Sequence, residues 1–144
     1  MAKVKLHRLK LAHTTEGELW SIFNPYDPDS ETPDYFALKQ VYITTIGPGK
    51  AKGPIVHRER SSIVVPTQGR VIIQLGPDRD DFEQNPASCL LEIPPTMPFR
   101  FVNPTDQTVM LLVLANKAWS PDDDDSIKYD GWDDYITKTT KQEQ

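Results

Sequence analysis

The segment 55–60 (IVHRER) carries side chains that could transfer protons. In an extended strand successive side chains point to opposite faces, so His57 and Glu59 are expected on one face and Arg58 and Arg60 on the other. An imidazole and a carboxylate that face one cavity can remove and return a proton. The alternative is that His57 is only a hydrogen-bonded core residue. We expect Arg58 and Arg60 on the surface, where clustered charges usually lie.

The elements that hold this segment are predicted to be strands. Thirteen prolines in 144 residues separate short runs rich in β-branched and aromatic residues, and proline breaks helices. Turn residues recur between the runs, as in 47–49 (GPG), 67–69 (TQG) and 103–106 (NPTD). This pattern is typical of an all-β sandwich or closed barrel. The strands are predicted at 4–11, 17–23, 39–46, 55–65, 70–75, 88–93, 99–103 and 108–115.

The length of the chain fits one domain, 1–144, with a core at about 36–118 and N-terminal strands within 3–23. The remainder, 119–144, is acidic. Ser120 and the run 122–125 (DDDD) suit a helix cap and a solvated first turn, so one or two short helices are predicted there. The run lacks the spacing and glycine of a calcium loop.

The composition of the chain indicates which classes of binding partner to expect. The net charge of −5, with 26% charged residues, argues against a nucleic-acid partner. No apolar run is long enough for a signal-peptide core or a membrane span, which favours a cytoplasmic protein without a membrane partner. Cys89 is the only cysteine and lies in an apolar run, so a packed, inert thiol is predicted.

Two segments resemble the cupin superfamily of RmlC-like proteins. The range 49–69 keeps the spacing of the first cupin motif, G(X)5HXH(X)3-4E(X)6G, and 88–103 that of the second, G(X)5PXG(X)2H(X)3N. The resemblance implies a single-domain cupin, or jelly-roll, β-barrel with a short C-terminal helical segment. In metal-dependent cupins three histidines and a glutamate bind the metal. Ile55, Ser62 and Phe99 stand at three of these four positions, so no metal and no other cofactor is expected.

Within the cupins, the range 39–135 resembles the dTDP-4-dehydrorhamnose 3,5-epimerases and the dTDP-4-keto-6-deoxyhexose 3,4-ketoisomerases. The resemblance lies in 40–43 (QVYI), 52–57 (KGPIVH), 93–95 (IPP) and 129–132 (YDGW). It implies a metal-independent isomerase or epimerase that acts on a nucleotide-linked 4-keto-6-deoxy sugar. Such an enzyme moves protons beside a ketone through an enolate, which needs only an acid and a base.

One departure changes the expected mechanism. The first histidine of the pair is commonly the base in these families, and Ile55 occupies that position. A substitute mechanism uses His57 or Glu59 as the base and Tyr42 as the acid, although Tyr42 also suits plain core packing. Basic side chains are expected to pair with the diphosphate. The predicted substrate-binding residues are Lys52, Arg70, Arg100, Ile55, Ser62 and Phe99.

The alternative function is a catalytically silent cupin that binds a small ligand or serves as an interaction module. Alternation predicts that Phe99 and Phe101 fill the cavity and that Arg100 points away. A homodimer is expected, with the strand 4–11 added to the sheet edge of a partner. The cavity of this module would be lined by Ile55, His57, Ile63, Val71, Ile73, Phe99 and Phe101.

Overall fold

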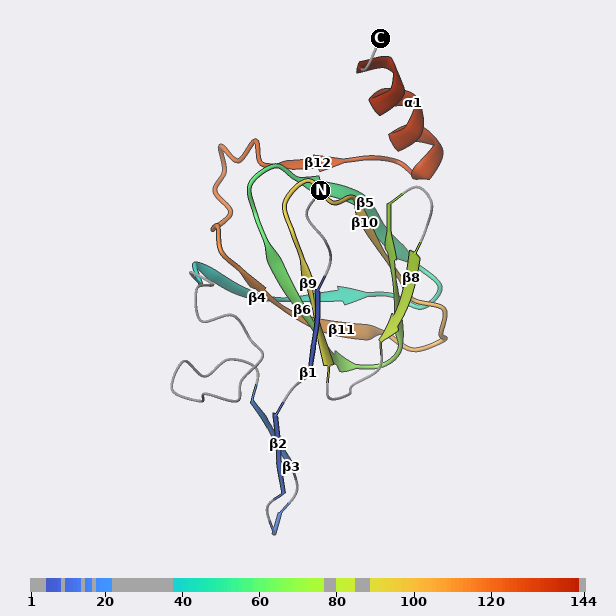
Figure 1. The fold of residues 1–144 in the computed structure, drawn as a ribbon. Coiled ribbons are helices and arrows are strands. Elements are labelled where there is room, and N and C mark those ends of the chain that lie inside the picture. Colours follow the sequence, from blue (N-terminus) through green and yellow to red (C-terminus); the bar gives the residue numbers. More distant parts are fainter. Residues whose placement is uncertain are drawn as a thin grey trace.

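The computed structural model describes residues 5–8, 10–13, 15–16, 18–21, 38–76, 80–84 and 89–142, with side chains described for 15–16, 38–76 and 90–140. These residues form strands and one C-terminal helix (Figure 1). The elements are β1 (Lys5–Arg8), β2 (Lys10–His13), β3 (Glu18–Ser21), β4 (Gln40–Ile46), β5 (Ala51–His57), β6 (Ser62–Gln68), β7 (Val71–Leu75), β8 (Asp80–Gln84), β9 (Cys89–Ile93), β10 (Phe99–Val102), β11 (Val109–Ala115), β12 (Ser126–Lys128) and α1 (Trp132–Gln142).

Two five-stranded antiparallel sheets make up the body of the fold. The first sheet has the order β1-β9-β6-β11-β4 and the second the order β12-β5-β10-β7-β8, while β2 and β3 form a separate hairpin. The sheets are not joined by strand pairing into one closed barrel within the described residues. They form a jelly roll, which confirms the predicted all-β class and the short C-terminal helix. No helix among these residues is long and apolar enough to cross a membrane.

The strand predicted at 55–65 is wrong as a single element. β5 ends at His57 and β6 begins at Ser62, because the backbone between them bonds to distant loops. The Arg58 N–H donates to the Asp125 carbonyl at 2.8 Å, and the Ser61 N–H donates to Asn116 Oδ1 at 2.8 Å. The short strands β8 and β12 were not predicted, and the prediction at 4–11 corresponds to two strands, β1 and β2.

An apolar core fills the space between the two sheets. It includes Ile73 on β7, Phe99 and Phe101 on β10 and Val113 on β11, with Ile55 packed against it. The two phenylalanines therefore point inward, as alternation predicts. Ile63 was expected in the same cavity, and this is wrong. It belongs to a second cluster, on the outer face of the first sheet, made of Ile63, Val65, Leu90 and Leu114.

The end of this core opposite His57 is held by Asn103, which is 1% exposed and follows β10. Its Nδ2 donates to the carbonyls of Ile46, Gly47 and Gln107. Its Oδ1 accepts the N–H and the hydroxyl of Thr105 at 2.9 and 2.7 Å. When a buried carbonyl loses its hydrogen-bond donor, the free-energy cost of removing that carbonyl from water is no longer offset. The asparagine retained from the second cupin motif is therefore structural.

We expect the substitution Asn103→Ala to lower the free energy of unfolding by about 2–3 kcal/mol, because it leaves buried carbonyls unpaired. Asp106→Ala in the same turn is the matched control, since Asp106 is exposed. Its stability should stay within about 0.5 kcal/mol of wild type. Urea unfolding followed by circular dichroism measures both, and equal stability of the two variants would contradict the structural role.

Candidate functional site

His57 lies at the end of β5 and is 7% exposed. Its ring packs against Phe99 with the centroids 5.5 Å apart. Its Nδ1 lies 2.9 Å from the Ser126 hydroxyl and 3.8 Å from Asp125 Oδ2. One nitrogen of the imidazole is thus fixed by β12 and by the residue that precedes it.

The surroundings of His57 favour its neutral form. Burial, together with a smaller effect of the positive charge of Arg60, lowers its pKa from 6.5 to about 4. The carboxylates of Asp125 and Asp123 raise the pKa of His57, but by less than burial and Arg60 lower it. Near neutral pH the imidazole therefore carries a free lone pair and can accept a proton.

The acidic segment 122–126 binds along the end of β5 and is not the solvated helix start that was predicted. The side chain of Asp125 is 0% exposed, and its Oδ1 accepts the Glu59 N–H at 2.6 Å. After it, β12 pairs with β5, with Ser126 opposite His57. The prediction failed because the Asp125 carboxylate accepts a backbone N–H 66 residues earlier in the chain, a pairing that local sequence does not reveal. The helix α1 begins later, at Trp132.

Arg60 was expected on the surface, and this is wrong. It is 4% exposed, its Nε donates to the Lys117 carbonyl at 3.0 Å, and its Nη2 lies 3.8 Å from Asp123 Oδ2. Its charge lowers the pKa of both His57 and Tyr42. The cation is buried because the chain turns inward after β5 and because a carboxylate faces it. Arg58 is exposed, as predicted.

Tyr42 is half-buried on β4 and packs against the inner core, so it comes from the first sheet while His57 comes from the second. Burial raises the pKa of its phenol above 10.0, and the charge of Arg60 partly offsets this. The phenol therefore stays protonated near neutral pH. No hydrogen bond joins Tyr42 to His57 among the residues described. Arg60 is the group whose charge acts on both.

The predicted face shared by His57 and Glu59 does not exist, because β5 ends at His57. The Glu59 side chain is 73% exposed and pairs with Lys117 Nζ at 2.8 Å.

Lys52 lies near the other end of β5, roughly 16 Å from His57 along the strand. Its Nζ donates to Thr44 Oγ1 at 2.8 Å. Arg70 is exposed and precedes β7. Lys52 and Arg70 thus lie toward the end of the sheet away from His57.

The other residues predicted to bind the substrate, Ile55, Ser62 and Phe99, lie at the inner core. Phe99 is 4% exposed, and Ile55 packs beside it. Ser62 is 3% exposed, and its buried hydroxyl has no hydrogen-bond partner.

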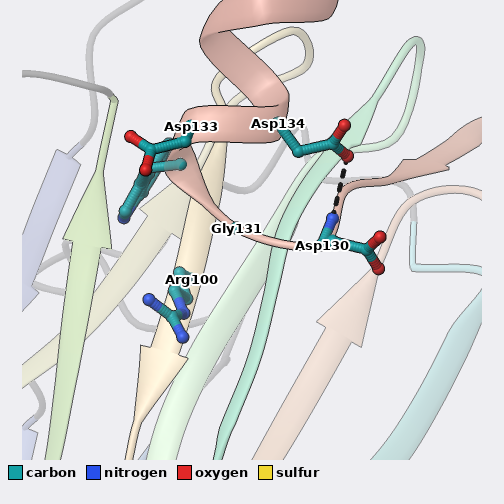
Figure 2. A pocket seen from close by; sticks show the side chains of 6 residues that line it. Arg100, Asp130, Gly131, Asp133 and Asp134 are labelled. Atoms are coloured by element: carbon teal, nitrogen blue, oxygen red, sulfur yellow. Dashed lines mark hydrogen bonds between the residues drawn. The ribbon is translucent and has the colours of Figure 1, made fainter.

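Arg100 lines a pocket outside the core, between β10 and the start of α1 (Figure 2). It points away from the interior, as predicted. The pocket has a volume of about 440 Å³, and Trp132 closes one side while donating its Nε1–H to Gln74 Oε1 at 3.0 Å. Asp134 accepts the Asp130 N–H and the Lys138 ammonium. The pocket does not contain His57 or Tyr42.

The side chains at the cupin metal positions do not fit a metal. Ile55 and Phe99 have no lone pair to donate, and the neutral hydroxyl of Ser62 stands where metal-dependent cupins have a carboxylate. Among the described residues no group of three or more histidine, cysteine, aspartate or glutamate side chains could hold one. The expected absence of a cofactor stays a prediction.

The fold and the motif spacing define a protein of the RmlC-like cupin class, related to dTDP-sugar isomerases and epimerases. A family model described as "FdtA: WxcM-like, C-terminal" matches residues 2–137, and the chain belongs to this family. A comparison with curated protein sequences gave no match.

Several solved structures share the fold. QdtA, a sugar 3,4-ketoisomerase from Thermoanaerobacterium thermosaccharolyticum in complex with TDP, is 26% identical with a TM-score of 0.71, and 96% of each chain is covered. A histidine-to-asparagine mutant of that enzyme, in complex with TDP-4-keto-6-deoxyglucose, is 26% identical with a TM-score of 0.73, covering 99% of this chain and 97% of the other. A 3,4-ketoisomerase from Helicobacter canadensis is 18% identical with a TM-score of 0.75, covering 97% and 99%.

Sequence reasoning missed three residues that surround His57: Arg60, Asp125 and Ser126. Asp125 follows three other aspartates, so its burial leaves no local signal. Arg60 was predicted on the surface from the alternation of a strand through residue 60, but β5 ends at His57, so that alternation does not reach Arg60.

We expect His57 to make stability depend on pH. Its folded pKa of about 4 lies below the usual 6.5, so between these values the unfolded chain binds a proton that the folded protein does not. Stability is therefore complete above pH 6.5 and falls as the pH approaches 4, by at most about 3 kcal/mol from this group. Urea unfolding at pH 7 and pH 4.5 should show a larger loss for wild type than for His57→Gln. Equal losses would mean that His57 titrates normally.

Proposed function

We propose that the protein is a metal-independent isomerase or epimerase of a nucleotide-linked 4-keto-6-deoxy sugar, with His57 as its base. The observation that carries the proposal is the buried, neutral imidazole, held by Ser126 and flanked by Asp125. Membership in the FdtA family and the likeness to a 3,4-ketoisomerase crystallised with TDP support the choice of substrate class.

The base function follows from the tautomer. With Nδ1–H donating to the Ser126 hydroxyl, Nε2 carries the lone pair and takes the proton from the carbon next to the ketone. The positive charge that forms on His57 is then stabilised by the buried carboxylate of Asp125. Asp125 and Ser126 are positioning residues in this scheme, because they act through the imidazole.

The protonated phenol of Tyr42 supplies the acid. For a 4-keto sugar, removing the C3 proton gives an enediolate between C3 and C4. If a proton returns to C4, O4 is protonated and O3 gives up its hydroxyl proton, so the ketone moves to C3. If a proton returns instead to the opposite face of C3, that carbon is inverted and the ketone stays at C4. Both outcomes conserve atoms and electrons with proton transfer alone, so the proposal includes no cofactor.

Lys52 and Arg70 are proposed to bind the diphosphate, since they are cations toward the same end of the sheet. Ile55, Ser62 and Phe99 are proposed to border the sugar. Glu59 and Arg100 are left out of this site, because Glu59 is exposed and paired with Lys117 and because Arg100 points away from the core. A catalytically silent module is not favoured by the neighbouring isomerases. A cytoplasmic location stays a prediction.

We expect wild-type protein to convert TDP-4-keto-6-deoxyglucose in D₂O with incorporation of deuterium beside the ketone, followed by proton NMR. His57→Asn should lower kcat by roughly 100-fold or more, the usual contribution of a general base. Glu59→Gln is the matched control and should stay within about twofold, because solvent already screens the Glu59 side chain. Full activity of His57→Asn would exclude it as the base.

We expect calorimetry to show base-selective binding of TDP over other nucleoside diphosphates. Lys52→Ala should weaken the Kd roughly tenfold, as the loss of one charged hydrogen bond does. Arg100→Ala should leave the Kd within about twofold, because its side chain lies outside the core. Binding of no nucleotide at all would remove this substrate class, whatever the activity of His57.

A further inference from the structure

Arg60 is a buried cation to which the proposed mechanism gives no role in binding the substrate. Its side chain is 5% exposed, and burying a guanidinium is costly unless a carboxylate faces it. That carboxylate belongs to Asp123, whose side chain is 4% exposed and whose Oδ2 lies 3.8 Å from Arg60 Nη2. This distance is too long for an N–H to donate a hydrogen bond to an oxygen. The two side chains therefore form an ion pair without a hydrogen bond between them.

The hydrogen bonds of the two side chains are made to the backbone. Arg60 Nε donates to the Lys117 carbonyl at 3.0 Å, and Asp123 Oδ1 accepts the Asp125 N–H at 3.0 Å. Arg60 Nη2 is buried and has no hydrogen-bond partner among the described residues. Nearly all buried polar groups in proteins have such a partner. The charge of Arg60 is thus compensated by Asp123, while Nη2 remains able to donate to a further acceptor.

Arg60 lies at the end of the core that holds the proposed base. The connection 58–61 runs from His57, the last residue of β5, to Ser62, the first residue of β6, and so passes from the second sheet to the first. The Ser62 hydroxyl is also buried and has no partner within the described part of the chain. The charge of Arg60 acts on both His57 and Tyr42, and a charge has this effect mainly on groups near it. Two buried donors without acceptors therefore lie at this end of the core.

We propose that Arg60 is a further catalytic residue, whose Nη2 donates a hydrogen bond to the substrate oxygen O4 as the enediolate forms. This inference rests on the proposed function. When His57 takes the C3 proton, the electron pair of the C3–H bond forms the C3–C4 double bond, and one pair of the C4–O4 double bond moves onto O4. Arg60 keeps its own protons and stabilises this negative charge. A donor in a buried site is effective here because little water competes with it.

The first test measures the exchange of the C3 proton of TDP-4-keto-6-deoxyglucose for deuterium in D₂O, because this step forms the enediolate. Arg60→Met should lower the kcat of exchange roughly 100-fold, as the loss of one such donor does, while KM changes by less than about threefold. Arg58→Met is the matched control, since Arg58 belongs to the same connection and its side chain is 57% exposed. Its kcat should stay within about twofold of wild type.

A double variant separates catalysis from a structural role. Arg60→Met alone leaves the Asp123 carboxylate buried without its cation, which costs stability. Combining it with Asp123→Asn removes both charges and keeps an oxygen that accepts the Asp125 N–H. The urea midpoint of the double variant should return toward that of wild type, whereas its exchange should stay roughly 100-fold slow. Recovery of exchange in the double variant would mean that Arg60 serves only the ion pair, which overturns its catalytic role.

The wild-type protein distinguishes the failure of this role from the failure of the proposed function. If wild type binds TDP but does not exchange the C3 proton, the proposed reaction and the role of Arg60 are both overturned. If wild type exchanges this proton and His57→Asn does not, an unchanged rate in Arg60→Met overturns the role of Arg60 alone.

Discussion

The contact between the end of β5 and the acidic segment 122–126 is the constraint on which the site depends. Asp125 accepts the Glu59 N–H with its side chain and the Arg58 N–H with its carbonyl, and it faces His57 with the other carboxylate oxygen. A buried carboxylate is costly unless donors and cations surround it. The same hydrogen bonds that end the strand therefore place a negative charge beside the imidazole.

Opposing charges then set the chemistry of His57. Burial and Arg60 keep the imidazole neutral, while Asp125 and Asp123 favour the protonated form. A base that starts neutral and meets a carboxylate once protonated suits proton transfer beside a ketone. Ile55 and Phe99, at two of the positions that bind the metal in metal-dependent cupins, are compatible with this chemistry, because proton transfer beside a ketone needs no metal.

Part of this arrangement could be predicted from the sequence. Turn residues and β-branched runs predicted the all-β class, and the resemblance to the cupins implied the jelly roll. Alternation placed Phe99, Phe101 and Arg100 on their faces, because this depends on local pattern. Glu59 and Arg60 were misplaced because the end of β5 is set by Asp125, over 60 residues later. The burial of Asp123 and Asp125 was missed for the same reason. Long-range pairing of polar groups leaves no periodic signal in a single sequence.

The most direct measurement is a crystal structure of the His57→Asn variant with TDP-4-keto-6-deoxyglucose. We expect the sugar to lie with C3 within about 3.5 Å of the side chain at position 57, the distance at which a reacting pair must lie. A sugar bound instead in the pocket beside Arg100 and α1, away from position 57, would contradict it.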